Sequence, residues 1–339
     1  MGGSSTCIKK LHKAAGLTLI LSLLGAICLI LFVNTALGGT ETGEFCPTCP
    51  DWTNLDGWLA KKEAYERQQM EAMQGGPQVA SSPPELPKVA APPKRYPAQE
   101  LLTTATAIDD GFVVLDVRTA EEYQSGHISG ARNLFWKDMQ KNGLLDAASA
   151  QVMLRKAGVN NSDRILIYGG SDEGAFFSFW ALNYLGHENM SLLDGGVEAA
   201  WKAGQTPVTV VPVFPESNYT SQIVPSRLVG ADDLDGLFNQ SDIEILDARD
   251  FVDYGKSKLT NSSIPLTADK LYEDFKIKDV KTLEDMLNRR DLNSKGVQLV
   301  YGTPQAYSLF FTLKLMGYNA TLLEGDWWQR SKWAVSNIR

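Results

Sequence analysis

Residues 165–185 predict a strand, a glycine-containing loop and a helix in that order. This unit constrains the possible folds of the chain most, because it occurs twice. Residues 165–168 are a β-branched apolar run, typical of a buried strand. The loop 169–174 follows, and the apolar stretch 175–185 predicts a helix that ends at Gly186. The loop amides and the helix N-terminus create a cradle that suits an anion or a thiolate. The residue on the floor of this cradle is Gly169, which has no thiol.

The same order returns in the second half of the chain. Residues 297–301 match the strand, 302–307 the loop and 308–316 the helix, and 322–328 repeat the strand and turn that begin at residue 191. An internal repeat of this size indicates two copies of one domain. Strands that alternate with helices predict an α/β fold, with a parallel sheet wrapped by helices in each copy.

The first copy resembles the rhodanese (thiosulfate sulfurtransferase) family. Residues 113–131 have the family's order of a strand, D-x-R, an acid with an aromatic residue, and G-H-I-x-G-A. The matching residues are Asp116, Arg118, Glu122, Tyr123, Gly126, His127, Ile128, Gly130 and Ala131. The resemblance implies two rhodanese-like domains, at 96–207 and 226–339, joined by the proline-containing linker 208–225. The second copy departs from the pattern, because residues 259–266 (LTNSSIPL) have no histidine.

The family resemblance also bears on activity. Family members that transfer sulfur carry it as a persulfide on a cysteine directly after the central strand, and in tandem members the second domain usually has that cysteine. This chain has Gly169 and Gly302 at the two positions, so we expect no catalytic residue and no cofactor. Thr303 is a weak candidate nucleophile, because no base lies near it in sequence.

Both loops stay candidate anion sites. Their residues are Gly169, Gly170 and Ser171 in the first loop and Gly302, Thr303, Gln305, Ala306 and Tyr307 in the second. We expect the second loop to be the better site because Asp172 and Glu173 place negative charge on the first, although Pro304 removes one N–H donor from the second.

The D-x-R motif has a predicted structural role in both copies. Asp116 with Arg118, and Asp247 with Arg249, are expected to pair and to hold the end of a strand. As a catalyst His127 would need a nucleophile beside it, so the resemblance implies that it ties down the loop after the first helix. The aromatic residues of 176–180 are expected to pack in the core and between the domains.

The N-terminal region predicts a membrane anchor. Lysines at positions 9, 10 and 13 precede an uncharged run at 14–39, which is long enough to cross a bilayer. We favour an uncleaved single-pass anchor in the cell membrane over a cleaved signal sequence with its cleavage site near 36–38. The positive-inside rule then places the globular part outside the cytoplasm, in a periplasmic or extracellular space. The anchor or signal covers 1–40, and 41–95 holds a C-x-x-C motif, a polar helix at 53–73 and a proline-rich stalk.

The four cysteines all precede residue 50, at positions 7, 28, 46 and 49. Cys46 and Cys49 form the C-x-x-C motif, and a local disulfide is the favoured interpretation outside the cytoplasm. A metal site would need further ligands, and a thioredoxin-like motif would need a βαβ context. We therefore predict no metal.

Net charge and glycosylation sequons bear on the molecules that this chain can bind or carry. The net charge of −8, with no basic stripe beyond the N-terminus, argues against nucleic-acid binding. On an exported chain, N-x-S/T sequons are acceptors for glycans. Six begin at Asn160, Asn189, Asn218, Asn239, Asn261 and Asn319.

Two functions of different classes remain. The first is an inactive, membrane-tethered tandem rhodanese that binds a protein partner or a small anion, as a scaffold or binding module. The second is a sulfurtransferase, or a handler of sulfur, selenium or tellurium oxyanions, that uses the thiols of Cys46 and Cys49. The stalk separates these thiols from both loops, which favours the first function.

Overall fold

The computed structural model describes residues 53–74, 95–170 and 173–336, and the chain divides into two compact units at residue 90. In the first unit, helix α2 (Leu55–Gln74) agrees with the predicted polar helix, and Asn54 Oδ1 accepts a hydrogen bond from the Gly57 amide at 3.2 Å. Within the described ranges no helix is both long and apolar enough to span a bilayer. The predicted anchor, the C-x-x-C motif and the proline-rich stalk lie outside the described residues.

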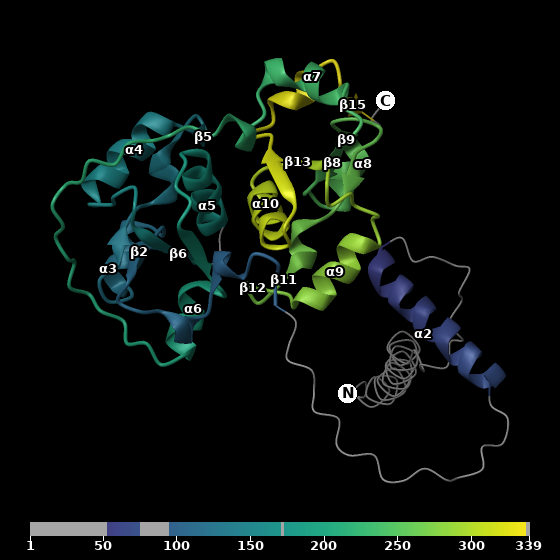
Figure 1. Ribbon diagram of the computed structural model, residues 1–339, viewed down its shortest axis with the longest axis horizontal. Coiled ribbons are helices and arrows are strands. Elements are labelled where there is room, and N and C mark those ends of the chain that lie inside the picture. Colours follow the sequence, from purple (N-terminus) through teal and green to yellow (C-terminus); the bar gives the residue numbers. More distant parts are fainter. Residues whose placement is uncertain (1–52, 75–94, 171–172, 337–339) are drawn as a thin grey trace, which may run out of the picture. The chain divides into compact units, whose positions relative to one another are not determined.

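The second unit begins with a five-stranded parallel sheet (Figure 1). Its order is β1 (Leu102–Thr103), β7 (Met190–Leu193), β6 (Arg164–Tyr168), β2 (Phe112–Asp116) and β3 (Arg132–Asn133). The α-helices are α3 (Ala120–Ser125), α4 (Ala147–Lys156), α5 (Gly174–Tyr184) and α6 (Gly196–Lys202), and the 3-10 turns are η1 (Gln99–Leu101), η2 (Ala105–Ala107) and η3 (Trp136–Met139). A hairpin of β4 (Gln140–Lys141) and β5 (Leu144–Leu145) stands apart from this sheet.

A second parallel sheet follows, with four strands. Its order is β10 (Ile264–Pro265), β8 (Ile243–Asp247), β13 (Val297–Tyr301) and β14 (Asn319–Leu322). The α-helices are α7 (Leu234–Phe238), α8 (Phe251–Lys256), α9 (Val280–Asn288) and α10 (Gln305–Leu315), and the 3-10 turns are η4 (Pro225–Arg227), η5 (Ala231–Asp233), η6 (Ala268–Leu271) and η7 (Trp327–Arg330). Two antiparallel strand pairs lie outside this sheet. They are β11 (Tyr272–Glu273) with β12 (Lys276–Ile277), and β9 (Ser257–Lys258) with β15 (Val335–Ser336). The predicted α/β fold with parallel sheets and helices is confirmed.

The central strands of the two sheets pair in matching registers. Asp116 lies opposite Tyr168 in the pairing of β2 with β6, and Asp247 lies opposite Tyr301 in the pairing of β8 with β13. Because the strands are parallel, their carboxyl ends meet at one edge of each sheet. Each D-x-R motif therefore lies beside the first residue of a loop, Gly169 or Gly302.

Both domains begin with short helical elements. In the first domain only η1 is helical before β1, because Leu102 and Thr103 pair with β7 as an edge strand. In the second domain η5 is followed directly by α7. Neither the β4–β5 hairpin nor the β11–β12 hairpin was predicted, since each has strands of only two residues.

The two domains share one apolar core along α5 and α10, which lie side by side between the sheets (Figure 1). Phe311 meets Phe179 edge-on at 4.9 Å between ring centroids and Phe176 at 5.8 Å. Tyr307 meets Phe177 at 5.1 Å and is likewise buried. The expected role of these aromatic residues in core and interdomain packing is confirmed.

Phe311→Ala tests this shared core. The ring is 1% exposed, so its loss should lower the free energy of unfolding by about 3–5 kcal/mol. Because the core is continuous, urea unfolding followed by fluorescence and by circular dichroism should shift as one transition. Phe251→Ala is the matched control: that ring is 44% exposed, and its removal should cost less than about 0.5 kcal/mol. Two separate transitions, with only the later one moved, would contradict a common core.

Candidate functional site

The first loop leaves room for a side chain at its floor. Gly169 is buried at the end of β6, and its carbonyl accepts a hydrogen bond from the Val197 amide at 3.1 Å. A Cβ atom at Gly169 would lie 3.3 Å from Ala175 Cβ, 3.4 Å from the Ala175 amide nitrogen and 3.5 Å from Val117 Cγ2. These contacts are tight but none is below 3.3 Å, so a shift of a few tenths of an ångström accommodates the added atom. Ser171, predicted as part of this loop, lies outside the described residues, as does Asp172.

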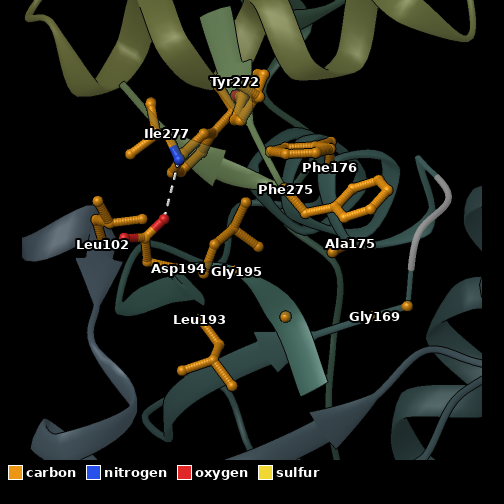
Figure 2. Close-up of a pocket in the computed structure, with 14 residues that line it drawn as sticks. Leu102, Gly169, Ala175, Phe176, Leu193, Asp194, Gly195, Tyr272, Phe275 and Ile277 are labelled. Carbon is orange, nitrogen blue, oxygen red and sulfur yellow. Dashed lines mark hydrogen bonds between the residues drawn. The ribbon is translucent and has the colours of Figure 1, made fainter. Parts of the chain in front are cut away.

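A cavity of about 30 Å³ adjoins Gly169 and Gly170 (Figure 2). Its lining combines the end of the first sheet with the hairpin of the second domain: Leu102, Gly169, Gly170, Ala175, Phe176, Leu192, Leu193, Asp194, Gly195, Gly196, Tyr272, Phe275, Ile277 and Phe311. The walls are mostly apolar, and no lysine or arginine is among these residues. A cavity of this size admits one small group, such as the end of a larger molecule.

The β11–β12 hairpin is held over this cavity by a carboxylate. Asp194 Oδ1 accepts a hydrogen bond from the Ile277 amide at 3.0 Å, which Figure 2 shows as a dashed line. Burial raises the pKa of Asp194 above its ordinary value. The hydroxyl of Tyr96 also donates to the Lys278 carbonyl at 2.7 Å, at the end of the same hairpin. The first domain therefore contacts the hairpin at two points.

The turn of that hairpin contains an unusual backbone conformation. Phe275 has φ +61° and is 53% exposed, while its ring lies at the cavity. A bulky residue in the left-handed region costs about 1–2 kcal/mol. The hairpin of the first domain has Gly143 (φ +78°) at the matching turn position, where no such cost arises. Such a conformation persists only where the surrounding contacts hold the residue in place.

The floor of the second loop is already filled. Gly302 has φ +91°, and a Cβ atom there would lie 2.5 Å from Arg249 Cγ and 3.1 Å from Arg249 Cδ. Arg249 is fixed in this position, because Nη2 donates to Asp247 Oδ2 and to the Ser257 carbonyl, each at 2.6 Å. The guanidinium carbon also lies 4.9 Å from the centre of the Trp328 ring. A side chain at Gly302 would therefore have to displace Arg249, and anion binding at the second loop stays a prediction.

The other predicted residues of the second loop make structural contacts. Thr303 Oγ1 accepts a hydrogen bond from the Gly325 amide at 3.2 Å, and the Ala306 amide donates to the Gly302 carbonyl at 3.1 Å. Gln305 is the first residue of α10. Tyr307 points to the domain interface, where its hydroxyl donates to Glu324.

Glu324 is a buried carboxyl that sequence reasoning missed. Its Oε1 accepts hydrogen bonds from the Tyr307 hydroxyl and the Leu145 amide, both at 2.9 Å. Leu145 belongs to the β4–β5 hairpin of the first domain, so this contact mirrors that between Asp194 and Ile277. Burial raises the pKa of Glu324 to about 7. The available signal was the repeated L-L-acid-G at 192–195 and 322–325.

The D-x-R residues and His127 support the sheet edges. Arg118 Nη2 donates to Asp116 Oδ2 at 2.6 Å, and the Tyr168 hydroxyl donates to the same oxygen at 2.6 Å. Burial, together with the Asp116 charge, raises the pKa of Tyr168. His127 is fully buried, its Nδ1 donates to the Tyr123 carbonyl at 2.9 Å, and the two rings stack 3.8 Å apart. These contacts hold the fold together and present no nucleophile.

Metal ligation has no support in the part of the chain that the structure describes. In those residues, no three His, Cys, Asp or Glu side chains are grouped as a metal ion requires. The predicted disulfide of Cys46 and Cys49 lies outside the described ranges.

Comparison with known proteins matches part of this chain to the rhodanese family. Residues 100–203 match the model of the rhodanese-like domain. A putative thiosulfate sulfurtransferase of Mycolicibacterium smegmatis is 33% identical over 117 residues, which cover 33% of this chain and 42% of that relative. One from Haloferax volcanii is 24% identical over 243 residues, which cover 64% of this chain and 84% of that relative. This chain therefore spans about two fifths of the mycobacterial relative and most of the archaeal one.

Solved structures share the fold. SseA from Escherichia coli, described as a 3-mercaptopyruvate sulfotransferase with the rhodanese fold, superposes with a TM-score of 0.59 at 20% identity, over 67% of this chain and 98% of SseA. The anaerobic ergothioneine biosynthesis enzyme from Chlorobium limicola gives a TM-score of 0.61 at 18% identity, over 70% of this chain and 69% of that one. At these identities the likeness establishes the fold.

Glu324 predicts a pH dependence of stability. Its folded pKa of about 7 lies above the ordinary value of 4.5, so between these pH values the folded chain binds more protons than the unfolded chain. The free energy of unfolding should therefore fall as pH rises from 4.5 to 7, and Glu324 should add no slope above that range. The buried Asp194 contributes with the same sign.

Glu324→Gln isolates this contribution. Urea unfolding from pH 4 to 8 should show wild type losing up to about 3 kcal/mol relative to the variant across this window. Glu121→Gln, at an exposed position, is the control and should follow the wild-type profile. If wild type and Glu324→Gln run parallel at every pH, the carboxyl is not buried at the interface as described.

Proposed function

We propose that this chain is a membrane-tethered, extracytoplasmic tandem rhodanese-like protein that binds a ligand or partner and has no sulfurtransferase activity. The observation that carries the proposal is the residue at the floor of each loop, Gly169 or Gly302. Persulfide chemistry requires a thiolate at that position. Every cysteine of the chain precedes residue 50, so neither domain supplies one.

The first loop is the better candidate for ligand binding. In the second loop the stem of Arg249 already lies against Gly302, whereas a cavity adjoins Gly169. The rings of Phe176 and Tyr272, 5.0 Å apart, form part of the cavity wall. With the carboxyl of Asp194 in that wall and no cation, the chemistry suits an uncharged, apolar group more than a free anion. The strained Phe275 then covers the occupant.

The tether is proposed from the sequence. The lysines before residue 14 and the uncharged run that follows support a single-pass anchor with the globular part outside the cytoplasm. The stalk spaces the domains from the bilayer. The repeat supports two domains, at 96–207 and 226–339, joined by a linker at 208–225.

A working sulfurtransferase is the second candidate, because curated relatives carry the name putative thiosulfate sulfurtransferase. In this chain the thiols would have to come from Cys46 and Cys49. As a disulfide, these two residues would first have to be reduced to supply a thiolate.

A thiosulfate:cyanide assay on the full chain separates the two candidates. We expect no thiocyanate above the rate without protein, with or without a reductant for Cys46 and Cys49. The double variant Cys46→Ser with Cys49→Ser is the control. Turnover that the double variant abolishes would favour the sulfurtransferase. Turnover that survives when all four cysteines of the chain are serine would contradict the requirement for a thiol.

Restoring a thiol should succeed only in the first loop. Gly169→Cys should fold normally and yield a thiol near the N-terminus of α5, whose dipole lowers a thiol pKa. Gly302→Cys should be destabilised by about 1–3 kcal/mol from the positive φ, and further because Arg249 must move. Thermal unfolding and the rate of thiol alkylation measure these outcomes.

Gly204→Cys is the matched control for Gly302→Cys. Its φ of +90° is the same within a degree, but nothing lies within 4 Å of its Cβ position. The extra loss in Gly302→Cys therefore reports the displacement of Arg249. Equal losses in the two variants would show that the second loop has room for a side chain.

A further inference from the structure

The sequons of this chain are distributed unevenly over the fold. The asparagines of all six sequons are exposed. The loops that follow the central strands begin at Gly169 and Gly302, and neither these loops nor the two hairpins contain a sequon. The segregation is visible only in the structure, because along the sequence the sequons lie before, between and after the two loops.

In the first domain, three sequons lie at the amino ends of the strands. Asn189 immediately precedes β7, and Asn160 precedes β6 by four residues. Asn218 belongs to the linker, but its neighbour Thr220 is bound to the same edge: its amide donates to Asn161 Oδ1 at 2.9 Å, and the Asn161 side chain donates to its carbonyl at 2.8 Å. The three asparagines therefore lie at the edge opposite the first loop.

Two of the three sequons in the second domain repeat this placement. Asn319 is the first residue of β14, and Asn239 precedes β8 by four residues. Asn261 is the exception, because it precedes β10, an edge strand that pairs with Leu246 and Asp247 at the carboxyl end of β8. Asn319 also lines a groove of about 770 Å³ at the amino ends of β13 and β14. A sugar at Asn319 would stand in that groove and exclude a protein partner from it.

We infer that the six sequon asparagines are N-glycan acceptors, and that five of their glycans cover the amino-end edges of the two sheets, while the loop edge of the first sheet, with Gly169, stays bare. The inference rests on the proposed extracytoplasmic location. In each transfer, the amide Nδ2 bonds to the anomeric carbon of an oligosaccharide. The bond from that carbon to the pyrophosphate of a lipid-linked donor breaks, and the amide loses one proton.

This arrangement assigns the two edges different roles. The bare edge carries the cavity beside Gly169 and the strained Phe275, so a ligand or partner reaches it without meeting sugar. The coated edge is bulky and solvated, which keeps the domains apart from neighbouring proteins.

The test uses the full chain with a C-terminal tag that contains an added acceptor sequence, expressed in a eukaryotic secretory host. Treatment with a peptide N-glycosidase should remove seven glycans, six from the chain and one from the tag. Each of the six single Asn→Gln variants at the sequon asparagines should migrate on a gel as a chain with one glycan fewer. Peptide mass spectrometry should place the sugars at the six asparagines.

Asn142→Gln is the control, because Asn142 is exposed at a hairpin turn but begins no sequon, and it should change nothing. A glycosylated tag with any of the six asparagines bare would overturn the inference for that residue and leave the proposed topology standing. An unmodified tag would contradict the topology, and the inference with it.

Discussion

The packing of α5 against α10 is the contact on which the rest of this structure depends. The two helices belong to the two copies of the repeat, and their aromatic residues form one core. Each helix begins directly after the loop of its own domain, so this packing also brings each loop under the hairpin of the other domain. Two buried carboxyls then fix the hairpins: Asp194 binds the amide of Ile277, and Glu324 binds the amide of Leu145. Burying these carboxyls has a cost, which their raised pKa values report.

The near symmetry of the two halves makes their differences informative. Both loops begin with glycine, but Gly302 has a left-handed backbone with the Arg249 stem against it, whereas Gly169 adjoins a cavity. Both hairpins turn through positive φ, but one uses Gly143 and the other Phe275. In both comparisons the bulky side chain belongs to the second half. Arg249 lies against Gly302 in its own domain, and Phe275 lies at the cavity beside Gly169 of the first domain. Among the described residues, Gly169 therefore adjoins free space, whereas a side chain at Gly302 would displace Arg249.

Much of the fold could be predicted from the sequence. The apolar runs before Gly169 and Gly302 predicted the central strands, and the D-x-R motifs predicted ion pairs that the structure shows at 2.6 Å. What escaped prediction depends on contacts between distant residues. Leu102 and Thr103 have no strand signal of their own and become a strand only by pairing with β7. The hairpins are too short for a periodic pattern, and the burial of Glu324 requires a hairpin 179 residues away in the sequence.

The central claim is that this pair of domains has kept the loop architecture and has no thiol to use in it. Intact mass measurement of the full chain after incubation with thiosulfate tests this most directly, since a persulfide adds one sulfur atom to the protein. We expect an unchanged mass for the chain with Cys46 and Cys49 held as a disulfide, and also for the variant in which both are serine. One added sulfur on that cysteine-substituted variant, mapped to a peptide from residues 95–336, would contradict it.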